Sequence, residues 1–420
     1  MATFTAQLIN PVAVEEVPDW TRAMATTFHG DPHGPAMARR IDVLRRAWDP
    51  DRAWGARDRG RWVATLRTEP RGFTVPGPDD GTIDLTVDAL TNVTVAATHR
   101  RRGLLSAMLG QSLRAAHNRG DALSVLIAAE WPIYGRYGYA PAVLSADYEL
   151  RTGRPGGTCD GDPSRVRQVA PGEFADVAEA VFAAARRRRA GQIDRDARWW
   201  NRVLGRDGYD PMEDGPHNWL VHEGDDGPDG LLAWRTSGNF GLLPPYATVE
   251  VWDLTSVGET AYRNLWAYLS GIDGVDQVRV ANRPVDEPLR WLLPDGRALV
   301  TTRVVDLVWL RLLDVPAALC ARRYAVPGEV ILEVVDDSEP SFASGRFRLT
   351  ADGATVTCEP TTQAADLELT QRGLASIYLG GITLREQQIA GVARELSPGA
   401  LHRVDLMFST PSAPWNATWF

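Results

Sequence analysis

The stretch TNVTVAATHRRRGLLSAMLGQSLRAAHNRGDALSVLIAAEWPIYGRYGYA, residues 91–140, decides how the chain folds. Apolar and polar residues alternate over residues 93–96, which is the period of a strand. Leucines then recur at four-residue spacing over residues 105–113, which predicts one apolar stripe along a helix. Gly120 is expected to end that helix, and the apolar run at 123–129 is typical of a buried strand.

The turn before the helix, HRRRG at residues 99–103, has the composition of an anion site. The first N–H groups of a helix have no internal partner, and the helix dipole places partial positive charge there. Gly103 lacks a Cβ, so a ligand can approach the backbone, and the arginines add bidentate donors. A pyrophosphate fits such a turn. The alternative is a solvated basic helix start. No GxxxxGK[ST] or GxGxxG motif occurs, which disfavours a nucleotide P-loop or a dinucleotide fold.

These motifs resemble those of a known family. Arg100-x-x-Gly103-x-Leu105 after a strand resembles the acyl-CoA pyrophosphate loop of the GNAT N-acetyltransferases, whose motif is [QR]xxGx[GA], so Leu105 departs from it. VTVAATHRRRGLL followed by AAEWPIYGRYGYAPA resembles the Eis (enhanced intracellular survival) branch, where HRRRGLL and IYGRFGYGPA are typical. The resemblance covers essentially the whole chain and is strongest in the first third.

The resemblance implies an α+β (mixed α/β) protein of two tandem GNAT-like folds and a C-terminal sterol-carrier-protein-like α/β domain. We place the acetyl-CoA-binding GNAT domain at residues 1–152, the second GNAT-like domain at 153–312 and the third domain at 313–420. The second domain repeats the element order of the first. Its counterpart of the basic turn, LTSVGETAYRNLW at residues 254–266, lacks the arginines. We therefore interpret it as a degenerate fold that has lost cofactor binding.

Periodicity predicts the elements of each unit. In the first unit we expect strands at 12–14, 62–68, 81–97 and 143–150, helices at 15–28 and 37–48, and a turn at 76–80. In the second we expect helices at 174–189, 194–204 and 261–269, and strands at 219–222, 230–237, 248–254, 277–281 and 299–312. In the third we expect strands at 330–335, 346–350, 355–358 and 366–369, helices at 373–379 and 384–392, and an aromatic tail at 400–420.

Composition narrows the class of protein. A chain of 420 residues suggests two or three domains, and 44% hydrophobic with 24% charged residues is ordinary for a globular protein. The net charge of −9 argues against nucleic acid as the main partner. Three widely spaced cysteines give no disulfide framework and no zinc spacing, which fits a reducing cytosol. We expect a cytoplasmic protein with no signal peptide and no membrane span.

Tyr134 is the candidate general acid. Acetyl transfer from a thioester to an amine needs a proton donor for the departing thiolate, and a phenol of pKa about 10 can serve. By chemistry alone, turn or core packing is the favoured interpretation of Tyr134, Tyr137 and Tyr139. The resemblance places the general acid of the family at the tyrosine of IYGR, which is Tyr134 here.

The terminal carboxylate of Phe420 is the candidate general base. A free α-carboxylate is a weak base unless it is desolvated, and chain ends are usually frayed. The resemblance implies that the carboxylate of a C-terminal Phe enters the active site, and the aromatic tail with Trp415 and Trp419 suits docking. Family members often carry Glu before the final Phe, whereas this chain has Trp419.

The resemblance also assigns contacts to the cofactor. Strand residues would pair through their backbone with the pantetheine arm, as an added strand does. Glu130 is equally well read as a solvated strand end. The expected cofactor contacts are Val93, Thr94, Val95, Arg100, Arg101, Arg102, Gly103, Leu104, Leu105, Ser106, Ala129 and Glu130.

The acceptor pocket is harder to locate. A polyamine needs carboxylates and aromatic walls. Asp31, Asp84 and Asp88 are the candidate carboxylates, although a solvated surface position is the favoured interpretation of each. Trp20 and Phe28 are candidate walls, with core packing as the favoured role. His29 and His33 fall in a Gly/Pro loop and no HExxH occurs, so we expect no metal.

Together these observations indicate an acetyl-CoA-dependent N-acetyltransferase in which the amine attacks the thioester directly. The resemblance implies aminoglycoside-like or lysine-type acceptors and a homohexamer built as a dimer of trimers. The alternative is a sensor or carrier that binds CoA or an apolar ligand without turnover.

Overall fold

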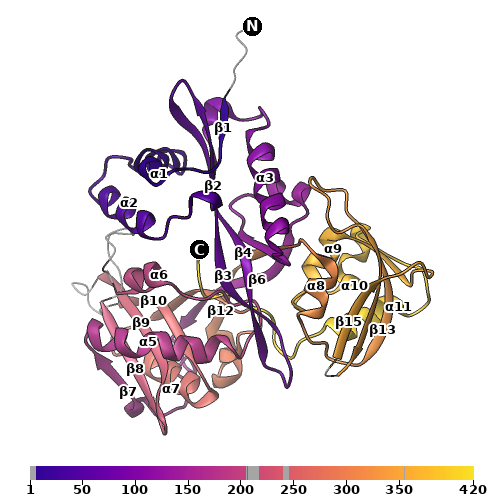
Figure 1. Ribbon diagram of the computed structural model, residues 1–420. Helices are drawn as coiled ribbons and strands as arrows, with labels where there is room; N and C mark the ends of the chain where they lie inside the picture. The colour runs from indigo at the N-terminus through magenta and orange to yellow at the C-terminus, as the bar shows by residue number, and fades with distance from the viewer. Residues whose placement is uncertain (1–5, 205, 207–216, 240–245, 354) are drawn as a thin grey trace.

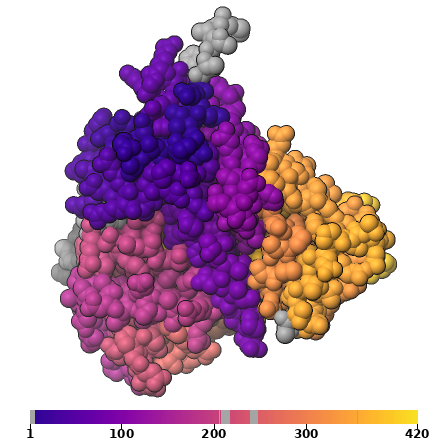
Figure 2. Space-filling view, viewed as in Figure 1, coloured from indigo at the N-terminus to yellow at the C-terminus, as the bar shows by residue number. Residues whose placement is uncertain are grey.

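The computed structural model describes residues 6–204, 206, 217–239, 246–353 and 355–420. Its strands form a twelve-stranded sheet, ordered β1-β2-β3-β4-β5-β12-β6-β11-β10-β9-β8-β7, and a five-stranded sheet, ordered β15-β14-β13-β16-β17. Figures 1 and 2 show the chain as three lobes, with the last lobe, in orange and yellow, beside the first two.

The first unit carries the elements that the organising stretch predicts. Helix α3 covers the expected leucine stripe and buries Leu109 and Leu113, and Gly120 ends it in the left-handed region at φ 83°. The elements are β1 (Gln7–Ile9), α1 (Val17–Thr27), α2 (Ala36–Arg46), β2 (Ala53–Asp58), β3 (Arg61–Pro76), β4 (Thr82–Val95), α3 (Leu104–Arg119), β5 (Leu123–Ile127), α4 (Trp131–Tyr134) and β6 (Ala140–Arg151).

The strand expected at 12–14 was a wrong prediction. The strand lies earlier, at β1, and Pro11 beyond it has no N–H to continue a ladder. Val12 instead packs into the core beneath α1, and its N–H donates to the carbonyl of Pro50 at 3.2 Å. Strand β3 runs beyond its expected end at Thr68, because its pairing with β4 continues to Pro76.

The second unit follows the predicted order. Helix α5 begins and ends three residues before the predicted 174–189, α6 is shorter than the predicted 194–204 at both ends, and only α7 extends beyond the predicted 261–269. Strand β7 was not predicted. The elements are β7 (Val166–Val169), α5 (Pro171–Arg186), α6 (Ala197–Val203), β8 (Asn218–Gly224), β9 (Gly227–Asn239), β10 (Tyr246–Ser256), α7 (Glu259–Ser270), β11 (Gln277–Arg283) and β12 (Leu299–Leu312).

The two units exchange their last strands. Strand β12 pairs antiparallel with both β5 and β6, and β6 pairs on its other side with β11. Strand β6, which ends the first unit, therefore lies beside β11 of the second unit. Strand β12, which ends the second unit, lies beside β5 of the first unit. The two GNAT-like units thus form one continuous sheet, while the boundaries proposed at residues 152 and 312 stay predictions.

The third unit packs helices on one small sheet. The helix expected at 384–392 is shorter, because α10 passes into a single 3₁₀ turn that ends at Gly391 with φ 71°. The segment read as a tail contains a further helix, α11, before the chain becomes extended. The elements are α8 (Val315–Cys320), β13 (Gly328–Val335), β14 (Gly345–Asp352), β15 (Thr355–Pro360), β16 (Leu367–Thr370), α9 (Gln371–Ile377), α10 (Leu384–Gln387), β17 (Ala393–Glu395) and α11 (Ala400–Phe408).

After α11 the chain returns to the centre of the molecule. Figure 1 shows the yellow tail passing from the third lobe to the C-terminus between β3 and α6. In the described part of the chain, no helix has both the length and the apolar character that crossing a bilayer requires. The three cysteines, Cys159, Cys320 and Cys358, are all free thiols.

Candidate active site

Strands β4 and β5 separate where the cofactor is expected. They pair in parallel only from Asp88 to Leu90 on β4 and from Ser124 to Leu126 on β5. Beyond that point β4 continues to Val95, held from its other side by β3. The edge of β4 that faces β5 is thus free of ladder pairing over residues 93–95, and an extended chain can add to it.

The basic turn lies at the open end of this separation. Gly103 is the N-cap of α3 at φ 78°, and no side chain caps the helix. A Cβ placed on Gly103 would meet no atom within 4 Å, so the space in front of the helix start is open. Arg100, Arg101 and Arg102 are all exposed, and Arg101 is itself left-handed at φ 61°. The turn therefore presents N–H groups and guanidiniums to solvent, as an anion site requires.

The other predicted cofactor residues differ in what they can offer. Thr94 is buried and its hydroxyl lies 2.6 Å from that of Thr65, so only its backbone faces the separation. The side chain of Leu104 is buried in the core, so only its backbone N–H, in the first turn of α3, can contact an anion. The Ser106 hydroxyl lies 2.8 Å from that of Tyr137, Leu105 is half-buried, and Glu130 is exposed as the N-cap of α4.

These features fit a diphosphate with an extended arm. The arm would follow the unpaired edge of β4, and the diphosphate would meet the uncapped start of α3. No group of three or more His, Cys, Asp or Glu side chains in the described ranges could hold a metal ion. That the reaction needs no metal stays a prediction.

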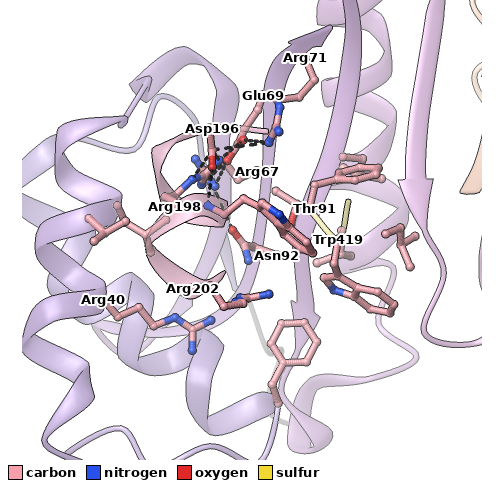
Figure 3. A pocket seen from close by; sticks show the side chains of 18 of the residues that line it. Arg40, Arg67, Glu69, Arg71, Thr91, Asn92, Asp196, Arg198, Arg202 and Trp419 are labelled. Carbon is pink, nitrogen blue, oxygen red and sulfur yellow. Dashed lines mark hydrogen bonds and ion pairs between the residues drawn. The ribbon is translucent and has the colours of Figure 1, made fainter. Parts of the chain in front are cut away.

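A cavity of about 490 Å³ opens where the separation ends (Figure 3). Its wall includes Val93 from β4, Ala129 after β5, Tyr134 from α4 and Phe420 at the chain end. The cavity therefore brings both candidate catalytic residues and two predicted cofactor contacts to one place. The remaining described lining residues are Phe28, Arg40, Val43, Leu44, Arg67, Glu69, Arg71, Leu90, Thr91, Asn92, Ile127, Asp196, Arg198, Trp199, Arg202 and Trp419.

Tyr134 is held with its ring largely buried. It ends the single turn of α4, and its ring meets that of Tyr139 edge-on at 6.2 Å between centroids. Burial, helped by the charge of Glu130, raises the pKa of Tyr134 to about 12. The phenol therefore keeps its proton at neutral pH, as a general acid must before the reaction.

The tail is fixed to the second unit by hydrogen bonds. The side chain of Asn416 is fully buried, and its Oδ1 accepts from the N–H of Ile193 at 3.2 Å and from that of Thr418 at 3.1 Å. The N–H of Ala417 donates to Gln192 Oε1 at 3.0 Å. Asn282, at the end of β11, donates through Nδ2 to the carbonyl of Asn416 at 3.1 Å. A chain end held so closely is docked, not frayed.

One side of the cavity carries a cluster of ion pairs that the sequence did not predict (Figure 3). Arg67, Glu69 and Arg71 alternate along β3, so their side chains share one face of the strand. Arg198 from α6 reaches Glu69, with Nη1 donating to Oε1 at 2.7 Å. The sequence signal for this cluster is the two-residue spacing of Arg67, Glu69 and Arg71 within a run that is otherwise largely apolar.

The predicted acceptor carboxylates lie elsewhere, and none of them lines the cavity. Asp84 accepts a bidentate pair from Arg186 at 2.6 and 2.9 Å. Asp88 is buried between Arg52 and Arg119, each 2.9 Å from Oδ1. Asp31 caps its own loop through the N–H of His33 at 2.8 Å. Each of these carboxylates is engaged by a structural partner instead of facing an acceptor.

Of the two aromatic residues that were candidate walls, Trp20 lies in the core and Phe28 lines the cavity. Trp20 is core, with its indole N–H donating to the carbonyl of Trp54 at 3.0 Å. Phe28 was expected in the core, but it follows the last turn of α1, is half exposed and lines the cavity.

Comparison with known proteins agrees with this arrangement. The family model "Acetyltransferase (GNAT) domain" matches residues 9–142, a second model of the same description matches 191–312, and "Sterol carrier protein domain" matches 315–417.

Relatives match along most of their length. The chain is 37% identical over 417 residues to an uncharacterized N-acetyltransferase of Streptomyces griseus, covering 97% of this chain and 98% of the relative. It is 34% identical over 350 residues to N-acetyltransferase Eis of Mycobacterium tuberculosis, covering 80% and 81%. The crystal structure of Eis1 from Mycobacterium abscessus superposes with a TM-score of 0.83 at 28% identity, covering 99% and 100%.

Proposed function

Because this chain belongs to the Eis-like GNAT N-acetyltransferases, we propose that it transfers an acetyl group from acetyl-CoA to a primary amine with its own Tyr134 and Phe420. Tyr134 is the general acid, and the terminal carboxylate of Phe420 is the general base. One observation carries the proposal: Tyr134, Phe420 and the end of the β4–β5 separation line one cavity. The resemblance suggests lysine-type and aminoglycoside-like amines as the first acceptors to assay.

The chain's own residues have distinct tasks in this proposal. Acetyl-CoA supplies the acetyl group already activated as a thioester. Arg100, Arg101 and Arg102 bind the diphosphate together with the N–H groups at the start of α3. The backbone of residues 93–95 aligns the arm along β4. The hydroxyl of Tyr134 gives its proton to the departing sulfur, and the carboxylate of Phe420 takes the proton that the amine loses.

The pH dependence of thiol release tests the proposal. Because the pKa of Tyr134 is raised to about 12, its phenol stays protonated from pH 6 to 10. A lysine-type amine has a pKa of about 10.4, so its reactive neutral fraction grows across this range. We expect kcat/KM to rise with pH and to show no falling limb below pH 10, measured as CoA release after subtraction of enzyme-free blanks.

Two results would count against the assignment. A falling limb below pH 10 that disappears in Tyr134→Phe would mean that the phenol titrates in the working range. Binding of acetyl-CoA in calorimetry without release of CoA with any primary amine would favour the sensor alternative.

We further propose that the protein assembles as a homohexamer, a dimer of trimers, as the family resemblance implies. Light scattering coupled to size exclusion should then give a mass near six times the 46.1 kDa of the chain, independent of concentration in the micromolar range. A stable monomer or dimer would contradict this proposal.

A further inference from the structure

The charge that lines the cavity suggests which amine it accepts. Five arginines and two side-chain carboxylates stand among the described lining residues. They are Arg40, Arg67, Arg71, Arg198 and Arg202, with Glu69 and Asp196. The terminal carboxylate of Phe420, which the proposed function uses as the base, adds one more negative charge, so the lining still carries an excess of positive charge. A cationic acceptor would need carboxylates that can turn toward it.

Both carboxylates are already engaged by guanidiniums. Glu69 accepts from Arg67, Arg71 and Arg198, and although burial opposes it, these charges lower the pKa of Glu69 to about 2. Asp196 accepts from Arg198 Nε at 2.6 Å and caps α6 through the N–H of Trp199 at 3.0 Å. Its pKa is also lowered, because Arg198 outweighs the effect of burial. Neither carboxylate can serve a second cation without releasing one of these partners.

The aromatic side chains of the lining do not offer a cation a better binding site than the engaged carboxylates do. The remaining lining is largely apolar and includes Phe28, Trp199 and Trp419. The ring of Trp199 already has the guanidinium of Arg195 at 4.9 Å and that of Arg202 at 6.0 Å from its centroid. Such a wall suits an apolar body on the acceptor rather than a second ammonium group.

We infer that the acceptor is a monoamine with an apolar, aromatic-sized body and a carboxylate, and that polycations are disfavoured. This inference rests on the proposed acetyl transfer and narrows its substrate class, because it sets aside the polycationic aminoglycoside-like acceptors that the family resemblance suggests. Arg40 from α2 and Arg202 from α6 approach the cavity on the side away from the ion-pair cluster, and Figure 3 shows Arg202 extending toward the side where Trp419 lies. The inference depends on the two side-chain carboxylates being engaged and on the excess of positive charge in the lining, to which Arg40 and Arg202 contribute whatever their present partners.

A matched acceptor series tests the inference on the full-length protein with acetyl-CoA. We choose para-(aminomethyl)benzoate, para-(aminomethyl)benzamide and para-xylylenediamine, which place a carboxylate, a neutral amide or a second amine on one rigid ring. We expect kcat/KM to be about tenfold lower for the benzamide than for the benzoate. For the diamine, kcat/KM divided by its two reactive amines should be about tenfold lower again. The difference should lie mainly in KM and should shrink at high salt.

Variants connect this preference to the cavity. Arg202→Gln should lower the carboxylate-to-amide ratio of kcat/KM about tenfold, and Arg202→Glu should move the preference toward the diamine. Arg46→Gln is the matched control, because it removes an exposed arginine of α2 that does not line the cavity. Its ratio should equal that of the unaltered protein.

The possible outcomes separate this inference from the proposed function. Equal rates for the three amines, or a preference for the diamine, overturn the inference and leave acetyl transfer standing. Transfer to aminoglycosides or polyamines but to none of the three also overturns it. No transfer to any amine overturns the proposed function and the inference together.

Discussion

Tyr134→Phe is expected to lower kcat by about 10²- to 10⁴-fold while the affinity for acetyl-CoA changes less than about threefold. The range is that of a positioned proton donor, and the hydroxyl is the only part of the side chain that is removed. The ring of Tyr134 keeps its contact with Tyr139, so the cavity keeps its shape. Single-turnover kinetics with acetyl-CoA and an acceptor amine would measure the chemical step, and calorimetry would measure binding.

Tyr139→Phe is the matched control. It removes a hydroxyl from the same aromatic cluster, but that hydroxyl lies 2.7 Å from Ser124 Oγ in the core, and Tyr139 does not line the cavity. It should cost about 1 kcal/mol of stability and leave kcat near that of the unaltered protein. Equal losses of kcat and acetyl-CoA affinity in Tyr134→Phe would instead indicate that Tyr134 supports the fold of the site.

The expected cofactor-binding elements could be predicted from the sequence because they are adjacent in the chain. A strand, a basic glycine turn and a helix are contiguous, so residues 91–120 alone predicted where α3 begins and ends. The role of Tyr134 was different, because nothing in its own sequence separates it from Tyr137 and Tyr139. Family resemblance chose Tyr134, and the structure places it on the cavity wall while Tyr139 is fully buried in the core.

No local sequence pattern predicted that the two units exchange their last strands. Strands β6 and β12 both read as apolar strands that end a unit, and either could complete its own sheet. Their pairing joins residues far apart in the chain, such as Val304 with Ala146, and the choice depends on the packing of the whole sheet. The continuous sheet therefore could not be deduced from the pattern of single segments.

The acceptor side was missed for a related reason. Glu69 and Arg198 are separated by 129 residues, so neither looks like a site by itself. Searching for carboxylates to hold a polyamine pointed to Asp84 and Asp88, which are engaged by arginines outside the cavity. Only the folded chain brings the arginines of β3, α2 and α6 around one cavity.

The second large effect is expected at the chain end. Adding two glycines after Phe420 should lower kcat by about 10²-fold or more, because the carboxylate is then displaced from the place where the amine loses its proton. Blocking the cavity would also lower activity, so a second protein is needed. A Phe420 carboxamide, made by ligation of a synthetic tail peptide, removes the charge without adding bulk.

The two proteins separate the possible roles of Phe420. If the carboxylate is the base, the carboxamide should lose about as much kcat as the extended protein and should still bind acetyl-CoA. If the tail only shapes the cavity, the carboxamide should be nearly as active as the unaltered protein, which would remove Phe420 from the mechanism. The unfolding temperatures of the extended, carboxamide and unaltered proteins should agree within a few degrees, because the hydrogen bonds of Asn416 and Thr418 lie before the altered chain end.

The buried hydrogen bonds of Asn416 can be tested separately from the terminal charge. Asn416→Ala removes a fully buried amide that ties the tail to Ile193, three residues before Asp196 in the cavity wall. Leaving the N–H of Ile193 without a partner should cost about 1–3 kcal/mol and loosen the tail while the Phe420 carboxylate itself is retained. We therefore expect kcat to fall less than in the carboxamide and to recover partly in Asn416→Asp, whose Oδ1 can still accept that bond. A loss in Asn416→Ala larger than that in the carboxamide would mean that the tail acts through the fold of the cavity rather than through its terminal charge.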